Sequence, residues 1–308
     1  MKPRNLMRLA PIVGFCLLAL FARPGGAQQI EVKDDVGKVF HLPAPPKRIV
    51  SLAPNVTEIL YALGLGDRVV AVTRYCNYPA AAEAKPKIGG LIDPDIERIK
   101  ALSPDLIVAF RGNTLSALAR LRELGLPVFT LDISGGLAAV PELVAKIGAA
   151  AGSRGAAETI LAALATKEKA VTEALASVRT VPKVFLSLHG SGLWTFGAPS
   201  YFTDLLRRVK AESITAGIDK LWFEYGRESL IRDDPDAIVI LARTDGEFRA
   251  AVRWFGQRAG LKTLRAVRAG RFLHLDQDSA SRFGPRLYDT LAEIGRLLRA
   301  VQGPGPTP

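Results

Sequence analysis

The sequence predicts an α/β protein with two Rossmann-like lobes of mainly parallel sheets, joined by one long rigid interlobe helix. Two observations predict this fold. Short apolar runs alternate with helical patterns before residue 153 and again after residue 180, an order typical of parallel strands covered by helices. Between them, residues 156–178 are rich in Ala, Glu, Lys and Leu without Gly or Pro, which favours one helix of about 35 Å over a flexible linker.

The composition supports such a fold, because 48% of the 308 residues are hydrophobic and 23% are charged. This share of apolar residues is enough for a packed core and excludes a disordered or collagen-like chain. The expected segments are a signal peptide (1–27), an N-terminal α/β lobe (28–152), the interlobe helix (153–180), a C-terminal α/β lobe (181–302) and a disordered tail (303–308).

In the first lobe, Gly64 and Gly125 follow helical patterns and are typical helix ends. Asn55 with Glu58 three residues later, before an apolar run, resembles a capping box that begins a helix. The expected strands are 48–52, 68–72, 105–110 and 127–131, and the expected helices are 55–63, 94–102, 113–124 and 137–151.

In the second lobe the alternation resumes after the long helix. Trp222, Phe223 and Tyr225 show no amphipathic period and are expected in a loop. The expected strands are 181–188, 237–241 and 272–275, and the expected helices are 201–209, 227–232, 247–256 and 285–301.

The N-terminus has the pattern of a signal peptide. Basic residues precede an apolar run at 10–22, which is too short to span a membrane, and the small residues Gly25 and Ala27 follow it. We expect cleavage near Ala27 and export to the periplasm. The bulky Phe15 before Cys16 argues against a lipoprotein site, and Cys76 is the only cysteine left after cleavage, so no intramolecular disulfide is expected.

Cleavage also lowers the net charge. The full chain has 41 Lys and Arg against 30 Asp and Glu, and removing four basic residues leaves 37 against 30, a net charge of +7. The basic residues are scattered at helical spacing. A solvated helical surface explains this pattern, and an acidic ligand or a membrane-surface partner is the alternative. The absence of a basic stripe argues against nucleic acid.

Two segments repeat each other at an offset of 131 residues. In 96–108 and 227–239, a glutamate (Glu97, Glu228) stands seven residues before a Pro-Asp corner, and an apolar strand follows. One explanation is local, because a glutamate is favourable at a helix N-terminus. The other is that this matched pair docks onto a two-subunit partner with arginine pockets, since arginine binds carboxylates bidentately.

At Arg48, Pro54, Asn55, Glu58, Leu63 and the segments 64–66, 67–73, 75–79, 86–90 and 93–108, the chain resembles the periplasmic binding proteins of cobalamin, haem and ferric-siderophore ABC importers. This resemblance implies a bilobed monomer that holds its ligand between the lobes, and a permease dimer with its ATPase as partner. It also implies that Glu97 and Glu228 meet arginines of the permease, which is the protein's only contact with the membrane.

Within the family the resemblance is closest to the cobalamin binders, which implies cobalamin or a related corrinoid as ligand. Leu91 departs from their pattern, because they have a tryptophan there, so haem and ferric siderophores stay open. Arg74, Arg111 and Arg282 would supply cations for an anionic siderophore. The candidate ligand-binding residues lie in loops, several of them after the carboxyl ends of expected strands, or in the case of Phe110 at the end of the strand itself: Tyr75, Phe110, Arg111, Trp194, Trp222, Asp278 and Arg282.

The three histidines, His41, His189 and His274, are too few and too scattered for a free metal site, which needs three or four convergent ligands. We therefore expect no resident metal or cofactor. His189 follows an expected strand and is a candidate axial ligand to the metal of a bound chelate. No catalytic motif stands in its required context, so an exported enzyme is only a remote alternative.

Overall fold

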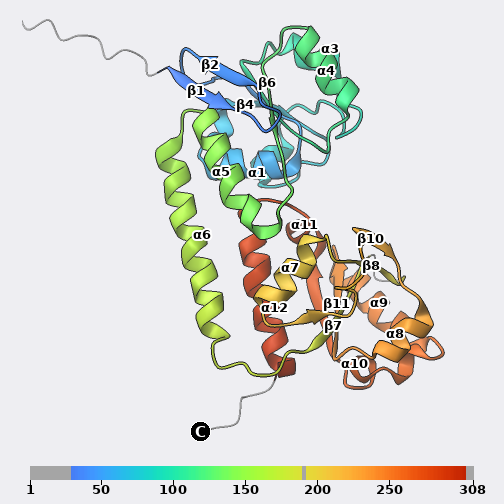
Figure 1. Cartoon of the computed structure of the whole chain (residues 1–308). Helices are drawn as coiled ribbons and strands as arrows, with labels where there is room; N and C mark the ends of the chain where they lie inside the picture. Colours follow the sequence, from blue (N-terminus) through green and yellow to red (C-terminus); the bar gives the residue numbers. More distant parts are fainter. Residues whose placement is uncertain (1–28, 189–191, 303–308) are drawn as a thin grey trace, which may run out of the picture.

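The computed structural model describes residues 29–188 and 192–302, and it confirms the predicted fold class (Figure 1). Two four-stranded sheets have the orders β4-β3-β5-β6 and β12-β11-β7-β9, and every neighbouring pair in them is parallel. The signal peptide and tail predictions, at 1–27 and 303–308, lie outside the described residues.

The N lobe comprises β1 to α5. Its elements are β1 (Ile30–Lys33), β2 (Val39–Leu42), β3 (Ile49–Ser51), α1 (Pro54–Ala62), η1 (Gly66–Arg68), β4 (Val69–Val72), α2 (Ala80–Glu83), α3 (Ile96–Ala101), β5 (Leu106–Phe110), α4 (Leu115–Glu123), β6 (Val128–Leu131), η2 (Gly136–Ala138) and α5 (Ala139–Ala150).

The C lobe comprises β7 to α12 and follows helix α6 (Arg154–Ala174). Its elements are β7 (Lys183–Ser187), β8 (Trp194–Phe196), α7 (Tyr201–Arg208), β9 (Glu212–Ser213), β10 (Trp222–Glu224), α8 (Arg227–Asp233), β11 (Ala237–Ala242), α9 (Asp245–Gln257), η3 (Leu261–Thr263), α10 (Arg265–Arg268), β12 (Phe272–Asp276), α11 (Gln277–Ala280) and α12 (Leu287–Gln302).

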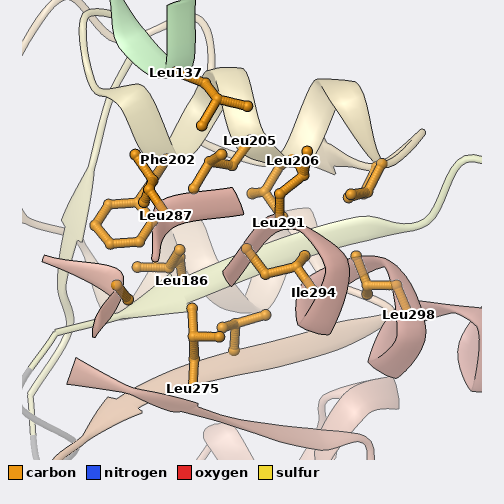
Figure 2. Packing of buried hydrophobic residues seen from close by; sticks show 14 of the residues in the cluster. Leu137, Leu186, Phe202, Leu205, Leu206, Leu275, Leu287, Leu291, Ile294 and Leu298 are labelled. Atoms are coloured by element: carbon orange, nitrogen blue, oxygen red, sulfur yellow. The ribbon is translucent and has the colours of Figure 1, made fainter. Parts of the chain in front are cut away.

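Each sheet is buried on both faces, which explains why its strands read as continuous apolar runs. In β5, Leu106 and Val108 join the core under α1 and α5, whereas Ile107 and Ala109 join the core under α3 and α4. The C lobe repeats this arrangement. One of its cores lies between the sheet and α6, α7 and α12 (Figure 2), and the other lies under α8, α9 and α10.

Helix α6 is packed into both lobes. Its Ala157 is part of an N-lobe core, and its Leu164 and Val171 are part of a C-lobe core. The helix has 21 residues, about 32 Å, and runs alongside both lobes (Figure 1). It begins two residues before residue 156 and ends four residues before residue 178, which are the two expected bounds.

The repeated segments have the same local structure. Ser103 and Asp234, at equivalent positions, both have positive φ angles of 45° and 38°. Asp105 accepts hydrogen bonds from the backbone N–H groups of Lys47 and Arg48 at 2.7 and 2.8 Å, and its counterpart Asp236 accepts one from Lys183 at 2.9 Å. Each Pro-Asp corner therefore anchors the start of the neighbouring strand.

Two local expectations are wrong. Ala53, not Asn55, is the N-cap of α1, and no side chain caps this helix. Glu58 does not fold back to cap the helix, because it pairs with Arg286 of the C lobe. Trp222 and Phe223 lie not in a loop but in strand β10, which pairs antiparallel with β8 and is too short to show a periodicity.

Candidate functional site

The N lobe contributes an exposed aromatic ring in the loop after β4. Tyr75 is 49% exposed, and the Arg74 guanidinium lies 5.8 Å from its ring centroid. Arg74 Nη2 donates to Asp93 Oδ2 at 2.7 Å, and this hydrogen bond lowers the pKa of Asp93. A Cβ at Gly90 would lie 2.3 Å from Asp93 Oδ1, so only glycine permits this close arrangement.

A buried asparagine that no sequence pattern singled out ties the loop of Leu91 to the N-lobe sheet. Asn113 is only 3% exposed. Its Nδ2 donates to the carbonyls of Leu52 and Leu91 at 3.0 and 2.9 Å, and its Oδ1 accepts from the N–H of Phe110 at 3.0 Å. One side chain therefore joins the ends of β3 and β5 to the loop of Leu91. Asn113 stands three residues after a strand, and asparagines are so common at such positions that the sequence alone does not indicate this structural role.

Phe110 is half-buried and packs against the N-lobe core, while Arg111 beside it is exposed. Arg111 Nη1 pairs with Asp132 Oδ2 at 2.8 Å. The N–H of Ser134 and then Arg111 hold the pKa of Asp132 below its usual range. Arg111, like Arg74, thus already has a carboxylate partner.

The C lobe contributes a pair of indole rings on the β8–β10 ribbon. Trp194 and Trp222 are 28 residues apart in the sequence, yet their ring centroids lie 5.1 Å apart at an interplanar angle of 38°. The pairing of Trp222 with Phe196 brings them together diagonally across the two strands. Trp222 is 58% exposed, and Leu221 before it is 56% exposed.

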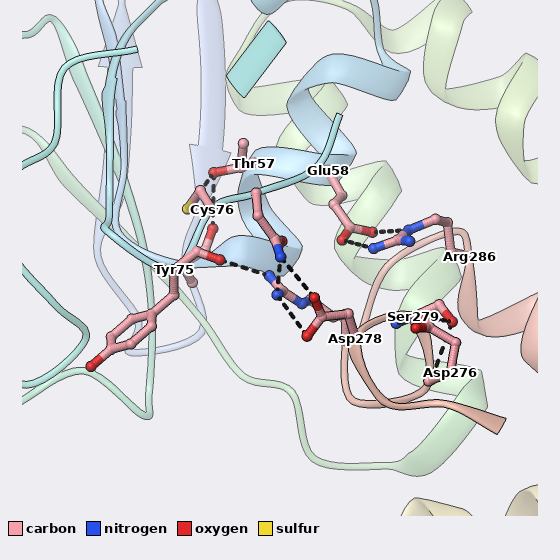
Figure 3. A network of polar contacts seen from close by, with 11 residues as sticks. Thr57, Glu58, Tyr75, Cys76, Asp276, Asp278, Ser279 and Arg286 are labelled. Atoms are coloured by element: carbon pink, nitrogen blue, oxygen red, sulfur yellow. Dashed lines mark hydrogen bonds and ion pairs between the residues drawn. The ribbon is translucent and has the colours of Figure 1, made fainter. Parts of the chain in front are cut away.

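The predicted polar pair, Asp278 and Arg282, contacts the N lobe, and Asp278 is labelled in Figure 3. Asp278 stands in the first turn of α11, and its Oδ2 accepts from Asn77 Nδ2 at 2.7 Å. Arg282 donates to the carbonyl of Tyr75 at 3.1 Å and to Asn77 Oδ1 at 3.0 Å. Both side chains therefore contact the N lobe, and their contact with a ligand stays a prediction.

The two repeated glutamates are exposed in equivalent places. Glu97 lies in the first turn of α3, which Asp95 caps by accepting from the N–H of Arg98 at 2.9 Å. Glu228 lies in the first turn of α8, with 82% of its side chain exposed. Its own backbone N–H and then Arg227 lower its pKa, so it is a carboxylate at neutral pH. Both helices lie away from α6 (Figure 1).

The described histidines have partners of their own. His274 Nε2 lies 3.2 Å from the carbonyl of Ala242, and its ring stacks on Phe248 at 4.8 Å. His41 is 3.5 Å from Glu31 in the β1–β2 hairpin, and His189 lies outside the described residues. Within residues 29–188 and 192–302, no group of three or more His, Cys, Asp or Glu residues could hold a metal ion.

Comparison with known proteins identifies the class of this molecule. A model of the periplasmic binding protein family matches residues 49–279. An ABC transporter substrate-binding lipoprotein of Bacillus subtilis is 30% identical over 262 residues, which cover 82% of this chain and 80% of that protein. The chain belongs to the periplasmic binding protein family. This result confirms the resemblance inferred from the sequence.

Two further relatives show which ligands similar proteins bind. A vitamin B12-binding protein of Pectobacterium atrosepticum is 29% identical over 266 residues, covering 84% of this chain and 91% of that protein. The crystal structure of a periplasmic heme binding protein from Pseudomonas aeruginosa superimposes with a TM-score of 0.74 at 27% identity, covering 85% of this chain and 96% of that chain.

This chain is thus a periplasmic binding protein of the ABC transporter type, which implies a permease and an ATPase as partners. The family is a class of solute-binding transport proteins rather than of enzymes. In the part of the chain that the structure describes, no helix combines the length and the apolar character needed to cross a membrane.

Proposed function

We propose that this binding protein captures cobalamin or a related corrinoid between its lobes and delivers it to a membrane permease. The observation that carries the proposal is the indole pair of half-buried Trp194 and exposed Trp222, together with the exposed ring of Tyr75 on the other lobe. Flat aromatic surfaces suit a large ligand with a planar, partly apolar ring system. The 29% identity to a vitamin B12-binding protein supports the same ligand class.

The arginines argue against a strongly anionic siderophore. Arg74 and Arg111 are each neutralised by an aspartate at 2.7 and 2.8 Å, and Arg282 bonds to the N lobe. An anionic ligand would have to compete with these partners for each guanidinium. Haem is the second candidate, because a heme binding protein has the same fold at 27% identity.

Calorimetric titration with cobalamin, cobinamide, haem and two ferric siderophores tests this proposal. We expect cobalamin or cobinamide to bind at least tenfold more tightly than haem, a difference of about 1.4 kcal/mol. Tighter binding of haem would select the second candidate, and absorption spectra would then report the axial ligand, including any role of His189. Binding of siderophores alone would refute the corrinoid proposal.

We also propose that the protein is exported after cleavage near Ala27 and docks as a monomer onto its permease through Glu97 and Glu228. Their equivalent places in the repeat and their exposure support this role. Two equivalent carboxylates suit the two subunits of a permease dimer, each offering an arginine pocket.

The variant Glu97→Lys/Glu228→Lys tests docking. We expect it to abolish ligand uptake in cells while the affinity measured by calorimetry stays unchanged, because the reversed charges would repel arginine pockets. Glu158→Lys/Glu173→Lys, the same change at two exposed positions of α6, is the matched control and should leave uptake intact. An equal loss of affinity in the first variant would mean that these glutamates serve the fold or the ligand instead.

A further inference from the structure

A buried ion pair connects the two lobes. Arg286, just before α12 of the C lobe, donates to Glu58 of α1 in the N lobe through Nε at 3.0 Å and Nη2 at 2.5 Å (Figure 3). The Glu58 side chain is only 2% exposed and that of Arg286 22%. The Arg286 guanidinium also lies 3.8 Å from the ring centroid of Tyr78. A Cβ at Gly284 would lie 3.2 Å from Glu58 Oε2, so the glycine leaves room for the pair.

A second arginine strengthens this connection from the same segment. Arg282, four residues earlier, bonds to the carbonyl of Tyr75 and to Asn77, and its side chain is only 11% exposed. Between the two arginines, Phe283 packs against the cores of both lobes. We call Glu58, Tyr78, Arg282 and Arg286 the interlobe clasp.

The clasp, α6 and a contact between η2 and α7 join the lobes at three separate places. In the last of these, the Leu137 N–H donates to Asp204 Oδ2 at 3.3 Å, and Leu137 packs into the C-lobe core. Helix α6 runs along the outside of the molecule, whereas α11 and the start of α12 lie between the lobes (Figure 1). One helix restrains the distance between two bodies but leaves them free to rock about it, and the other attachments restrict that rocking. A small displacement at the clasp would break the bidentate bonds while the Glu58 carboxylate is still shielded from water. Because these bonds are directional, the pair resists small changes of angle as well as separation.

The geometry points to Glu58 and Arg286 as positioning residues that hold the loop of Tyr75 in a fixed place relative to the C lobe. The ligand then enters a site whose two halves are already set, and its binding energy is not spent on closing the lobes. This inference rests on one part of the proposed function, namely that the ligand binds between the lobes. The fixed arrangement of the lobes follows from the contacts themselves.

The test uses Glu58→Ala/Arg286→Ala, which removes both charges and so leaves none buried without a partner. Spin labels at Ser116→Cys on α4 and Ala250→Cys on α9, both exposed, report the distance between the lobes, while buried Cys76 stays unlabelled. We expect a broader distribution of distances and at least tenfold faster dissociation of cyanocobalamin. The matched control is Glu293→Ala/Arg296→Ala, an exposed pair at 2.5 Å within α12 that should change neither.

Arg286→Lys provides a second variant that keeps the charge, and it loses only the bidentate geometry and the stacking on Tyr78. We expect it to lie between the wild type and the double variant in both measurements. If the double variant has a distance distribution as narrow as that of the wild type, the inference is overturned. A broader distance distribution with an unchanged rate of cyanocobalamin dissociation overturns it as well. If the wild type binds no corrinoid, the proposed function fails, and the distance measurement alone decides whether the clasp fixes the lobes.

Discussion

Removing the exposed indole of Trp222 should weaken ligand binding at least tenfold. The ring is 58% exposed. An aromatic side chain buries about 150 to 250 Å² when fully covered, so a ligand could cover about 90 to 145 Å² more of this one. At about 25 cal/mol/Å² this area corresponds to about 2 to 4 kcal/mol, an upper bound because the cover is rarely complete. Since about 1.4 kcal/mol changes an affinity tenfold, a tenfold loss is a modest expectation.

The assay is calorimetric titration of Trp222→Ala with the tightest ligand of the panel. Trp254→Ala is the matched control, because Trp254 lies on α9, packs edge-on against Phe255 at 5.1 Å and is stacked by Arg258 at 5.0 Å. We expect the control to lower the thermal stability and to leave the affinity unchanged. An affinity of Trp222→Ala equal to that of the wild type would refute the placement of this ring in the ligand site.

Two further predictions concern stability. Asp105→Ala and Asp236→Ala should each lower the free energy of unfolding by about 0.5 to 1.5 kcal/mol in urea titrations, because each removes the acceptor of one or two backbone N–H groups at the start of a strand. An unchanged value would contradict the shared role of the two corners. Burial tends to raise the pKa of Asp204, but hydrogen bonds from Arg207 and Arg208 outweigh this effect and lower the pKa overall. The ionised carboxylate therefore stabilises the fold above about pH 4, and this stabilisation is lost as the pH falls through the lowered pKa. The advantage of the wild type over Asp204→Asn should therefore shrink between pH 7 and pH 3, and a constant difference would show that the charge has no part in it.

Most strands and helices could be predicted from the sequence. Leu106–Phe110 and Ala237–Ala242 are short apolar runs after a Pro-Asp corner, and their length and flanking turn residues favour a buried parallel strand over a helix. Apart from α6, the ends of the elements that were predicted shift by no more than two residues. The β8–β10 ribbon was missed, because two strands of three residues are defined by their partner and not by any period of their own.

The candidate site was predicted less completely. Tyr75 and the two tryptophans could be selected because an aromatic side chain outside the expected strands and helices is unusual, although Trp194 and Trp222 lie in the short strands β8 and β10. The partner of Glu58 could not be predicted, since Arg286 is 228 residues away and nothing near either residue indicates the other. Asn113 was missed for a similar reason, because its three partners belong to three different segments.

The sequence by itself determined the order of the elements, the two lobes and the matched glutamates, because periodicity, helix-ending glycines and an internal repeat are encoded by residues close together in the chain. Only the tertiary structure decided that Trp194 stacks with Trp222, that Arg74 and Arg111 already have acidic partners, and that Asp278 and Arg282 contact the other lobe. These contacts depend on how strands pair and how the two lobes pack, and such long-range packing leaves no local signal in the sequence.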